Sequence, residues 1–145
     1  MIAPQKAMNH SLRIGTSFYA GYFVVTALEA LWIGVGPHWF RAAKAWADLH
    51  PPNFAPKIAL IALLGLTAAW AVHRGYRLAW YVAVVWAGLL CLSAVVLALI
   101  LIISRSWDLV LSHAPESIGG FVQVVCLAAS LLYLCRREAR ESILR

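Results

Sequence analysis

One acidic residue lies deep inside a long apolar stretch, where a charge is costly. Glu29 is the only charged side chain in the run from Gly15 to Gly36. A carboxylate in hydrocarbon needs a place inside a helix bundle, a bound proton or a polar partner. Gln123 lies at nearly the same depth in a later apolar run, so we hypothesise an interhelical hydrogen bond between the two side chains. Thr67 or Ser93 would then face the pair from the remaining helices.

Two tryptophans belong to the same hypothetical ligand or proton site. Trp32 lies one helical turn beyond Glu29, and Trp86 is expected to pack within the bundle or to line a pocket. Trp80 instead fits an aromatic belt at the membrane surface. The alternative interpretation is that Glu29 and Gln123 only hold two helices together, which is worth about 1 kcal/mol.

Other chemistry-bearing residues do not form a recognisable site. The histidines and acids of the two long connections lack H-E-x-x-H spacing, and the three cysteines form no C-x-x-C pair. Nothing resembles a nucleophile elbow, a phosphate-binding loop or a paired-carboxylate site. We therefore predict no catalytic residue, no metal site and no cofactor, and we do not expect an enzyme.

The composition indicates which solvent surrounds the elements that carry these residues. Of 145 residues, 63% are hydrophobic and only 12% are charged. The mean hydropathy is +0.78. Soluble domains are about 45 to 50% apolar and about 25% charged, and a chain this short has no interior large enough for the excess. The lipid bilayer is therefore the expected surrounding.

Four apolar runs are each long enough to cross a membrane as a helix of about 20 residues. They cover about residues 15–36, 56–72, 78–103 and 118–135. No repeat or flexible linker divides the chain, so we expect residues 1–145 to form a single integral membrane domain. The predicted fold is all-α, a four-helix transmembrane bundle.

Most of the lysines and arginines lie in the two tails and in the turn from His73 to Arg77. Short loops rich in these residues remain in the cytoplasm, so both termini are predicted to be cytoplasmic. The expected location is the inner membrane, crossed several times. The net charge of +6 fits anionic headgroups beside the spans, and no basic segment is suited to nucleic acid.

The connection between the first two spans has a pattern of its own. It predicts one short amphipathic helix that begins at Pro37 and ends before Pro51. This helix either lies on the outer membrane surface or packs over the top of the bundle. We expect the aromatic residues of the outer connections to form an interface; they are Trp39, Phe40, Trp46 and Trp107. The tail after Arg136 is expected to continue the helix of the fourth span.

The second half of the chain carries two short motifs, RGYRLAWYVAVVWAGLL from Arg74 and LLYLCRREARESI from Leu131. The first motif has a basic turn followed by Ala-Trp, and the second ends the last span with Tyr-Leu before an Arg-rich segment. With these motifs the chain resembles a broad set of small, uncharacterised four-span bacterial membrane proteins. The resemblance implies the fold and the membrane location, and it implies no activity.

Two functions are compatible with these features. The first is a non-catalytic membrane protein that binds a membrane or toxin partner, as an accessory subunit or an immunity-type protein does. The alternative is a proton-coupled small transporter or a lipophilic-ligand binder that uses Glu29. Beyond the lipid bilayer, the expected partner is another membrane protein or a second copy of the chain.

Overall fold

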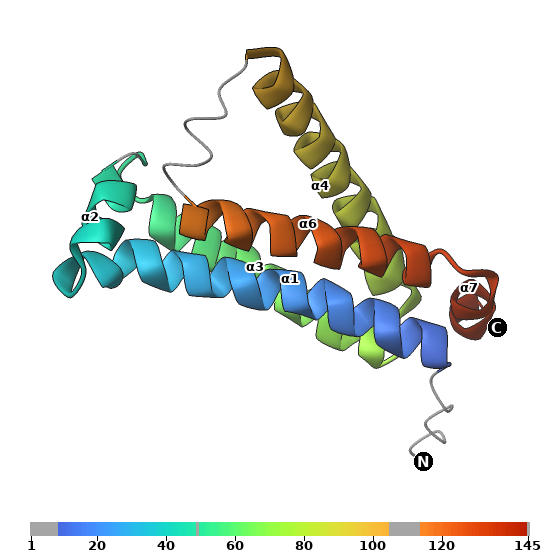
Figure 1. Ribbon diagram of the computed structural model, residues 1–145. Coiled ribbons are helices and arrows are strands. Elements are labelled where there is room, and N and C mark those ends of the chain that lie inside the picture. The colour runs from blue at the N-terminus through green and yellow to red at the C-terminus, as the bar shows by residue number, and fades with distance from the viewer. Residues whose placement is uncertain (1–8, 49, 105–113, 145) are drawn as a thin grey trace.

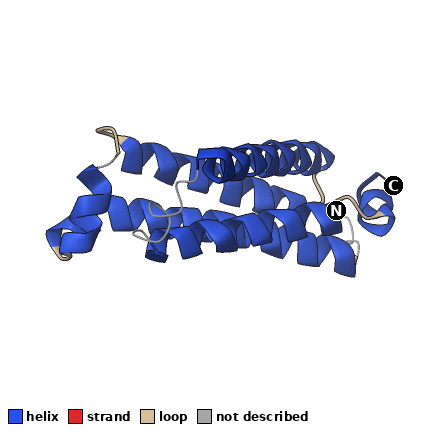
Figure 2. Cartoon of the chain, turned by 45° about the horizontal axis from the view of Figure 1, so that its top comes forward, coloured by secondary structure: helices blue, strands red, loops and turns tan. Residues whose placement is uncertain are grey.

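The chain folds as a set of helices, described for residues 9–48, 50–104 and 114–144 of a computed structural model (Figure 1). All regular structure within these ranges is helical, and they contain no strand (Figure 2). The elements are α1 (His10–Gly34), the 3-10 turn η1 (Gly36–His38), α2 (Arg41–Asp48), α3 (Phe54–His73), α4 (Arg77–Ser104), α6 (Ala114–Leu134) and α7 (Arg137–Leu144). The predicted all-α class is confirmed.

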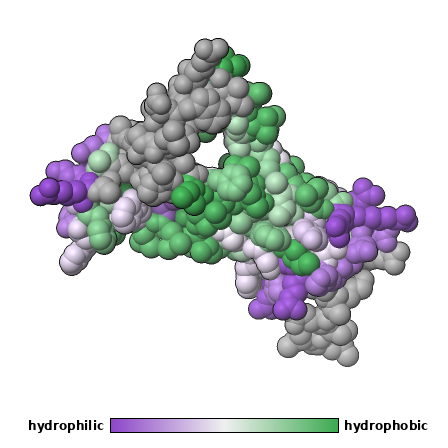
Figure 3. Space-filling view, viewed as in Figure 1, coloured by the Kyte–Doolittle hydropathy of each residue, from purple (hydrophilic) through white to green (hydrophobic). Residues whose placement is uncertain are grey.

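Several helices have the length and composition needed to cross a membrane. Three stretches qualify alone, His10–His38, Phe54–His73 and Arg77–Ile100. α6 and α7 make a fourth if the pair is taken as one span, with a bend of 67° between them. Hydrophobic residues cover the middle of the visible surface, and hydrophilic residues gather toward the α2 end and the α7 end (Figure 3). The surface therefore has an apolar belt between two polar ends, as expected of a transmembrane bundle.

α1 is the central helix and packs along α3 and α6 (Figure 1). Its start is fixed by Asn9, whose side chain accepts a hydrogen bond from the backbone N–H of Ser11 at 3.0 Å. Tyr19 and Phe23 of α1 are buried in the core against small residues of the neighbouring helices, such as Ala69 of α3. Small residues let helices approach closely in a membrane, where packing rather than water drives association.

α4 packs against the other helices through its first half only. Trp80, Ala83 and Ala87 are buried in the core. Beyond Cys91 the helix leans away from α6 and α1 (Figure 1), and most of its large apolar side chains are exposed. In a membrane this half of α4 faces lipid or another protein.

In the connection between the first two spans, the helix is shorter than predicted. Pro37 lies in η1, and α2 begins only at Arg41. The single helix predicted from Pro37 is thus wrong in its start, although α2 has the predicted amphipathic character. Gly36 allows this fold, because a Cβ there would lie only 2.8 Å from the Cβ of Ala43, which is itself fully buried.

The tail does not continue the fourth span, so that prediction is wrong. α6 ends at Leu134, and α7 turns by 67° and packs across the end of the bundle. Ala139 and Ile143, one turn apart, are buried in the core, and Ser11 Oγ donates a hydrogen bond to Glu138 Oε2 at 2.9 Å. The apolar face of the tail explains the bend, because a straight continuation would leave it unpacked.

Candidate functional site

A small polar cluster joins α1 to α6 within their otherwise apolar contact. Gln123 Nε2 donates a hydrogen bond to Glu29 Oε2 at 2.8 Å, and it lies 3.4 Å from Thr26 Oγ1. The hydroxyl of Thr26 donates to the backbone carbonyl of Tyr22 at 2.9 Å, which leaves its oxygen to accept from the amide. The interhelical hydrogen bond between Glu29 and Gln123 is therefore present, and Thr26 is its third member.

Helical spacing explains how these side chains meet. Thr26 and Glu29 are three residues apart on α1, while Gly119 and Gln123 are four residues apart on α6, so each pair shares one helix face. Gly119 makes room for the carboxylate, because a Cβ at this position would lie 3.4 Å from Glu29 Oε1. One carboxylate oxygen is thus held by the amide, and the other lies beside the bare backbone of α6.

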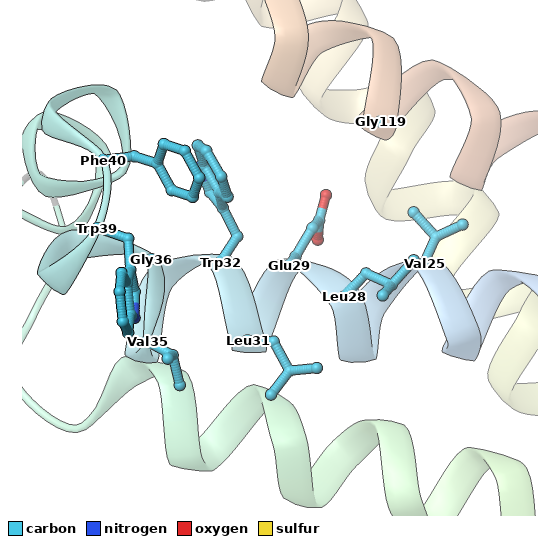
Figure 4. A pocket seen from close by; sticks show the side chains of 10 residues that line it. All are labelled: Val25, Leu28, Glu29, Leu31, Trp32, Val35, Gly36, Trp39, Phe40 and Gly119. Atoms are coloured by element: carbon cyan, nitrogen blue, oxygen red, sulfur yellow. The ribbon is translucent and has the colours of Figure 1, made fainter.

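A groove of about 720 Å³ opens next to this cluster, toward the α2 end of the bundle (Figure 4). It is lined by Val25, Leu28, Glu29, Leu31, Trp32, Val35, Gly36, Trp39, Phe40 and Gly119. Glu29 is the only charged group among them, and it points toward α6 (Figure 4). The groove is therefore an apolar surface with a single acidic group at its inner part.

Aromatic side chains form the wall of the groove nearest α2. The rings of Trp32 and Phe40 stack with centroids 5.4 Å apart and planes 25° from parallel. Trp32 comes from the end of α1 and Phe40 from the turn before α2, so the chain reversal at η1 brings them together (Figure 4). Trp39 lies next to Val35 on the other side of α1 in the same view.

The other predicted residues are only partly gathered at this groove. Trp39 and Phe40, predicted as interface residues, line it beside Trp32. Trp46 belongs to α2, but its side chain lies outside the described residues, as does the whole of Trp107. Their assignment to an interface stays a prediction.

Two expectations about the tryptophans of α4 are reversed. Trp86 is 39% exposed and does not belong to the described lining of the groove, whereas Trp80 is 5% exposed. The indole Nε1 of Trp80 donates to the backbone carbonyl of Leu134 at 3.2 Å. The position of a residue in the sequence predicts its depth in the membrane, but it does not predict how the helix is rotated about its axis. This rotation decides which tryptophan faces the bundle.

Thr67 and Ser93 do not join the polar cluster. Each is exposed and donates its hydroxyl hydrogen bond to a backbone carbonyl of its own helix, Leu64 and Leu90 respectively. Thr26 and Gly119 occupy the positions that we expected for Thr67 or Ser93, and the sequence analysis predicted neither residue. The three- and four-residue spacings to Glu29 and Gln123 were the available signal.

The arrangement can hold a ligand, and it offers few groups for chemistry. A fixed carboxylate among aromatic and aliphatic side chains can attract a cation or accept hydrogen bonds. An electrostatic interaction with His50, on the connection after α2, also acts on Glu29. Within the described ranges, no three His, Cys, Asp or Glu residues are grouped closely enough to hold a metal ion.

The chain matches no family model, no curated protein and no solved structure. The resemblance to small four-span membrane proteins therefore stays a prediction, and the proposals below depend on the geometry of the chain itself.

Proposed function

We propose that this chain is a non-catalytic membrane protein that binds a lipophilic cation in the groove beside Glu29. The observation that carries the proposal is one carboxylate at the inner part of an apolar groove of about 720 Å³, held by Gln123 at 2.8 Å. The sequence alone favours partner binding, and the groove moves the preference to its alternative, the ligand binder.

The chemistry of the groove defines the ligand. Its apolar and aromatic lining suits a hydrophobic body, and stacked Trp32 and Phe40 present ring faces that attract positive charge. An anionic ligand would meet Glu29 unfavourably, and a neutral one would gain a hydrogen bond from it at most. Leu28 and Leu31 are exposed on α1, so a ligand dissolved in the membrane can reach the groove sideways.

Binding of tetraphenylphosphonium to the purified protein in mild detergent tests the proposal. We expect Glu29→Gln to weaken binding about tenfold, which corresponds to about 1.4 kcal/mol. The amide keeps the size of the side chain and a hydrogen bond to Gln123, so the fold should survive. Glu138→Gln is the matched control, since it removes an acid at the α7 end. Equal binding by both variants would contradict the proposal.

The proton-coupled form of this function predicts a pH dependence. A proton and a cation compete for the same carboxylate, so ligand binding should weaken as the pH falls and strengthen as it rises. Because His50 interacts electrostatically with Glu29, the titration is repeated with His50→Gln. A dependence that persists in Glu29→Gln but vanishes in His50→Gln would exclude competition at the carboxylate.

A second candidate is the partner-binding protein, either an accessory subunit or an immunity-type protein. The apolar surface of the second half of α4 favours this candidate, because the described helices leave Val96 and Ile100 exposed. A photo-crosslinking residue at Val96 should capture one defined partner in the native membrane. The same residue at Leu64, exposed on α3, is the control and should capture none.

We also propose that the protein lies in the inner membrane with both termini in the cytoplasm. The start of α1 and the whole of α7 lie at the same end of the bundle (Figure 1). That end also carries Arg74, Arg77 and the arginines of the tail, which supports its assignment to the cytoplasmic side.

A further inference from the structure

We propose that the first turns of α1 bind the headgroup of an anionic phospholipid. A hollow of about 350 Å³ lies on the surface there, at the opposite end of α1 from the groove beside Glu29. It is lined by His10, Arg13, Ile14, Ser17 and Phe18. The site is independent of the proposed ligand groove and of its function.

The lining residues share one face of the helix. Positions 10, 13, 14, 17 and 18 follow the three- and four-residue steps that place side chains above one another. Along the helix, the hollow begins with the polar residues His10 and Arg13. Ile14 and Ser17 follow, and Phe18 forms its far end. Arg13 and Phe18 are five residues apart, which is about 7.5 Å along the axis.

This gradient matches a phospholipid better than a free anion. A phosphate beside Arg13 and Ile14 would place the start of an acyl chain against Phe18, about 7.5 Å deeper in the membrane. Free phosphate would use only the charged half of the hollow. Ser17 Oγ already donates to the backbone carbonyl of Arg13 at 2.9 Å, so the donors for a phosphate are His10 and Arg13.

Among the residues that the structure describes, no ion pair neutralises the positive charge of Arg13 in the hollow. The only salt bridge between described residues joins Arg137 to Glu141 at 2.7 Å. Glu138 also lies at this end of the bundle, but it accepts its hydrogen bond from Ser11, which is buried on a different face of α1. Arg13 therefore remains available to an external anion.

An aromatic stack holds a second arginine beside the hollow. Phe18 stacks on Tyr133 of α6, with ring centroids 6.3 Å apart and planes 16° from parallel. The guanidinium of Arg136 lies over the ring of Tyr133, 4.6 Å from its centroid. This stack fixes the apolar wall and holds Arg136 at the same membrane surface as Arg13.

Native mass spectrometry of the delipidated full chain, titrated with phosphatidylglycerol or phosphatidylcholine, tests the proposal. We expect phosphatidylglycerol to bind about tenfold more tightly than phosphatidylcholine, and Arg13→Gln to weaken its binding about fivefold. Arg77→Gln removes an exposed arginine at the same end of the bundle, on α4, and should change binding by less than about twofold. Equal losses in these two variants would overturn the site in favour of a diffuse charge effect.

A second pair of variants separates a built site from simple charge attraction. Phe18→Ala leaves the charge unchanged and should still weaken phosphatidylglycerol binding, whereas Phe121→Ala, an exposed phenylalanine on α6, should not. Inorganic phosphate should fail to displace the lipid, and Glu29→Gln should leave lipid binding unaltered. Displacement by phosphate, or an unchanged Phe18→Ala variant, would overturn the proposal.

Discussion

A single glycine and a single ring form a close contact between α1 and α3. Phe23 of α1 is fully buried, and its ring meets Tyr19 and Tyr22 edge-on at centroid distances of 5.0 and 4.8 Å. Gly65 of α3 lies directly against the ring, so that a Cβ there would overlap its atoms. The neighbouring aromatics leave Phe23 no room to move aside.

We predict that Gly65→Ala lowers the stability of the protein in detergent by about 1 to 3 kcal/mol, because the added methyl overpacks the α1–α3 contact. Thermal unfolding measures the loss. Gly88→Ala is the matched control, since a Cβ at Gly88 meets nothing within 4 Å and this glycine also lies inside a helix. Unfolding temperatures that fall equally in both variants would contradict the packing argument.

The hydrogen bond between Glu29 and Gln123 should contribute little to stability. We predict a coupling of about 1 kcal/mol in a double-mutant cycle of Glu29→Leu and Gln123→Leu, as for other interhelical hydrogen bonds in membranes. Thermal or denaturant unfolding in detergent measures it. A coupling of several kcal/mol would show that the pair is chiefly structural, and it would weaken the case for a ligand site.

The sequence predicts part of this site and misses the rest for a physical reason. Depth along each span is set by residue count, and it brings Glu29 and Gln123 to the same level, where they bond at 2.8 Å. The rotation of each helix about its axis depends on tertiary packing, which the apolar pattern of a lipid-facing helix does not encode. The exchanged roles of Trp80 and Trp86 depend on that rotation, whereas Thr26 and Gly119 could have been found from their helical spacing to Glu29 and Gln123.

Among the elements, α6 ends in an unusual way for a helix. Its final carbonyl, that of Leu134, would bond to the N–H of residue 138 if the helix continued. Here it accepts from the indole of Trp80 at 3.2 Å, and the chain is free to turn into α7. Trp80, on the neighbouring helix α4, thus caps the C-terminus of α6.

Trp80→Phe keeps the aromatic packing and removes this hydrogen bond. We predict a loss of about 1 to 3 kcal/mol in stability, because a buried carbonyl is left unsatisfied, together with faster amide hydrogen exchange in α7. Trp70→Phe, at an exposed tryptophan on α3, is the control. Exchange in α7 that is the same in both variants would show that the indole does not hold this corner.

The sequence predicts the long helices well, but it does not predict the connections between the helices. Long apolar runs identify α1, α3, α4 and α6 within a few residues, since a membrane requires about 20 apolar residues per helix. The bend before α7 and the late start of α2 depend on small buried contacts at Ala139 and Ala43. Such contacts involve residues far apart in the chain, and alanine alone does not signal them.

The whole molecule has two polar ends. The α2 end and the α7 end lie at opposite ends of the apolar belt (Figure 3). We predict that an impermeant maleimide labels Arg41→Cys in intact cells and labels Cys135 only after the membrane is opened, in chains lacking the other cysteines. Both residues are exposed, so reactivity is comparable. Labelling of both from outside would contradict cytoplasmic termini.

The lean of α4 has a consequence for the membrane as well as for the protein. With 28 residues, α4 is about 42 Å long, more than the roughly 30 Å of hydrocarbon that a helix must cross, and a slanted course absorbs the difference. Because α4 joins the other helices at one end and parts from them at the other (Figure 1), we expect the protein to occupy more area in one lipid monolayer than in the opposite one. A wedge-shaped protein favours a curved bilayer. We therefore expect the chain to be enriched in small, strongly curved vesicles relative to large, weakly curved ones.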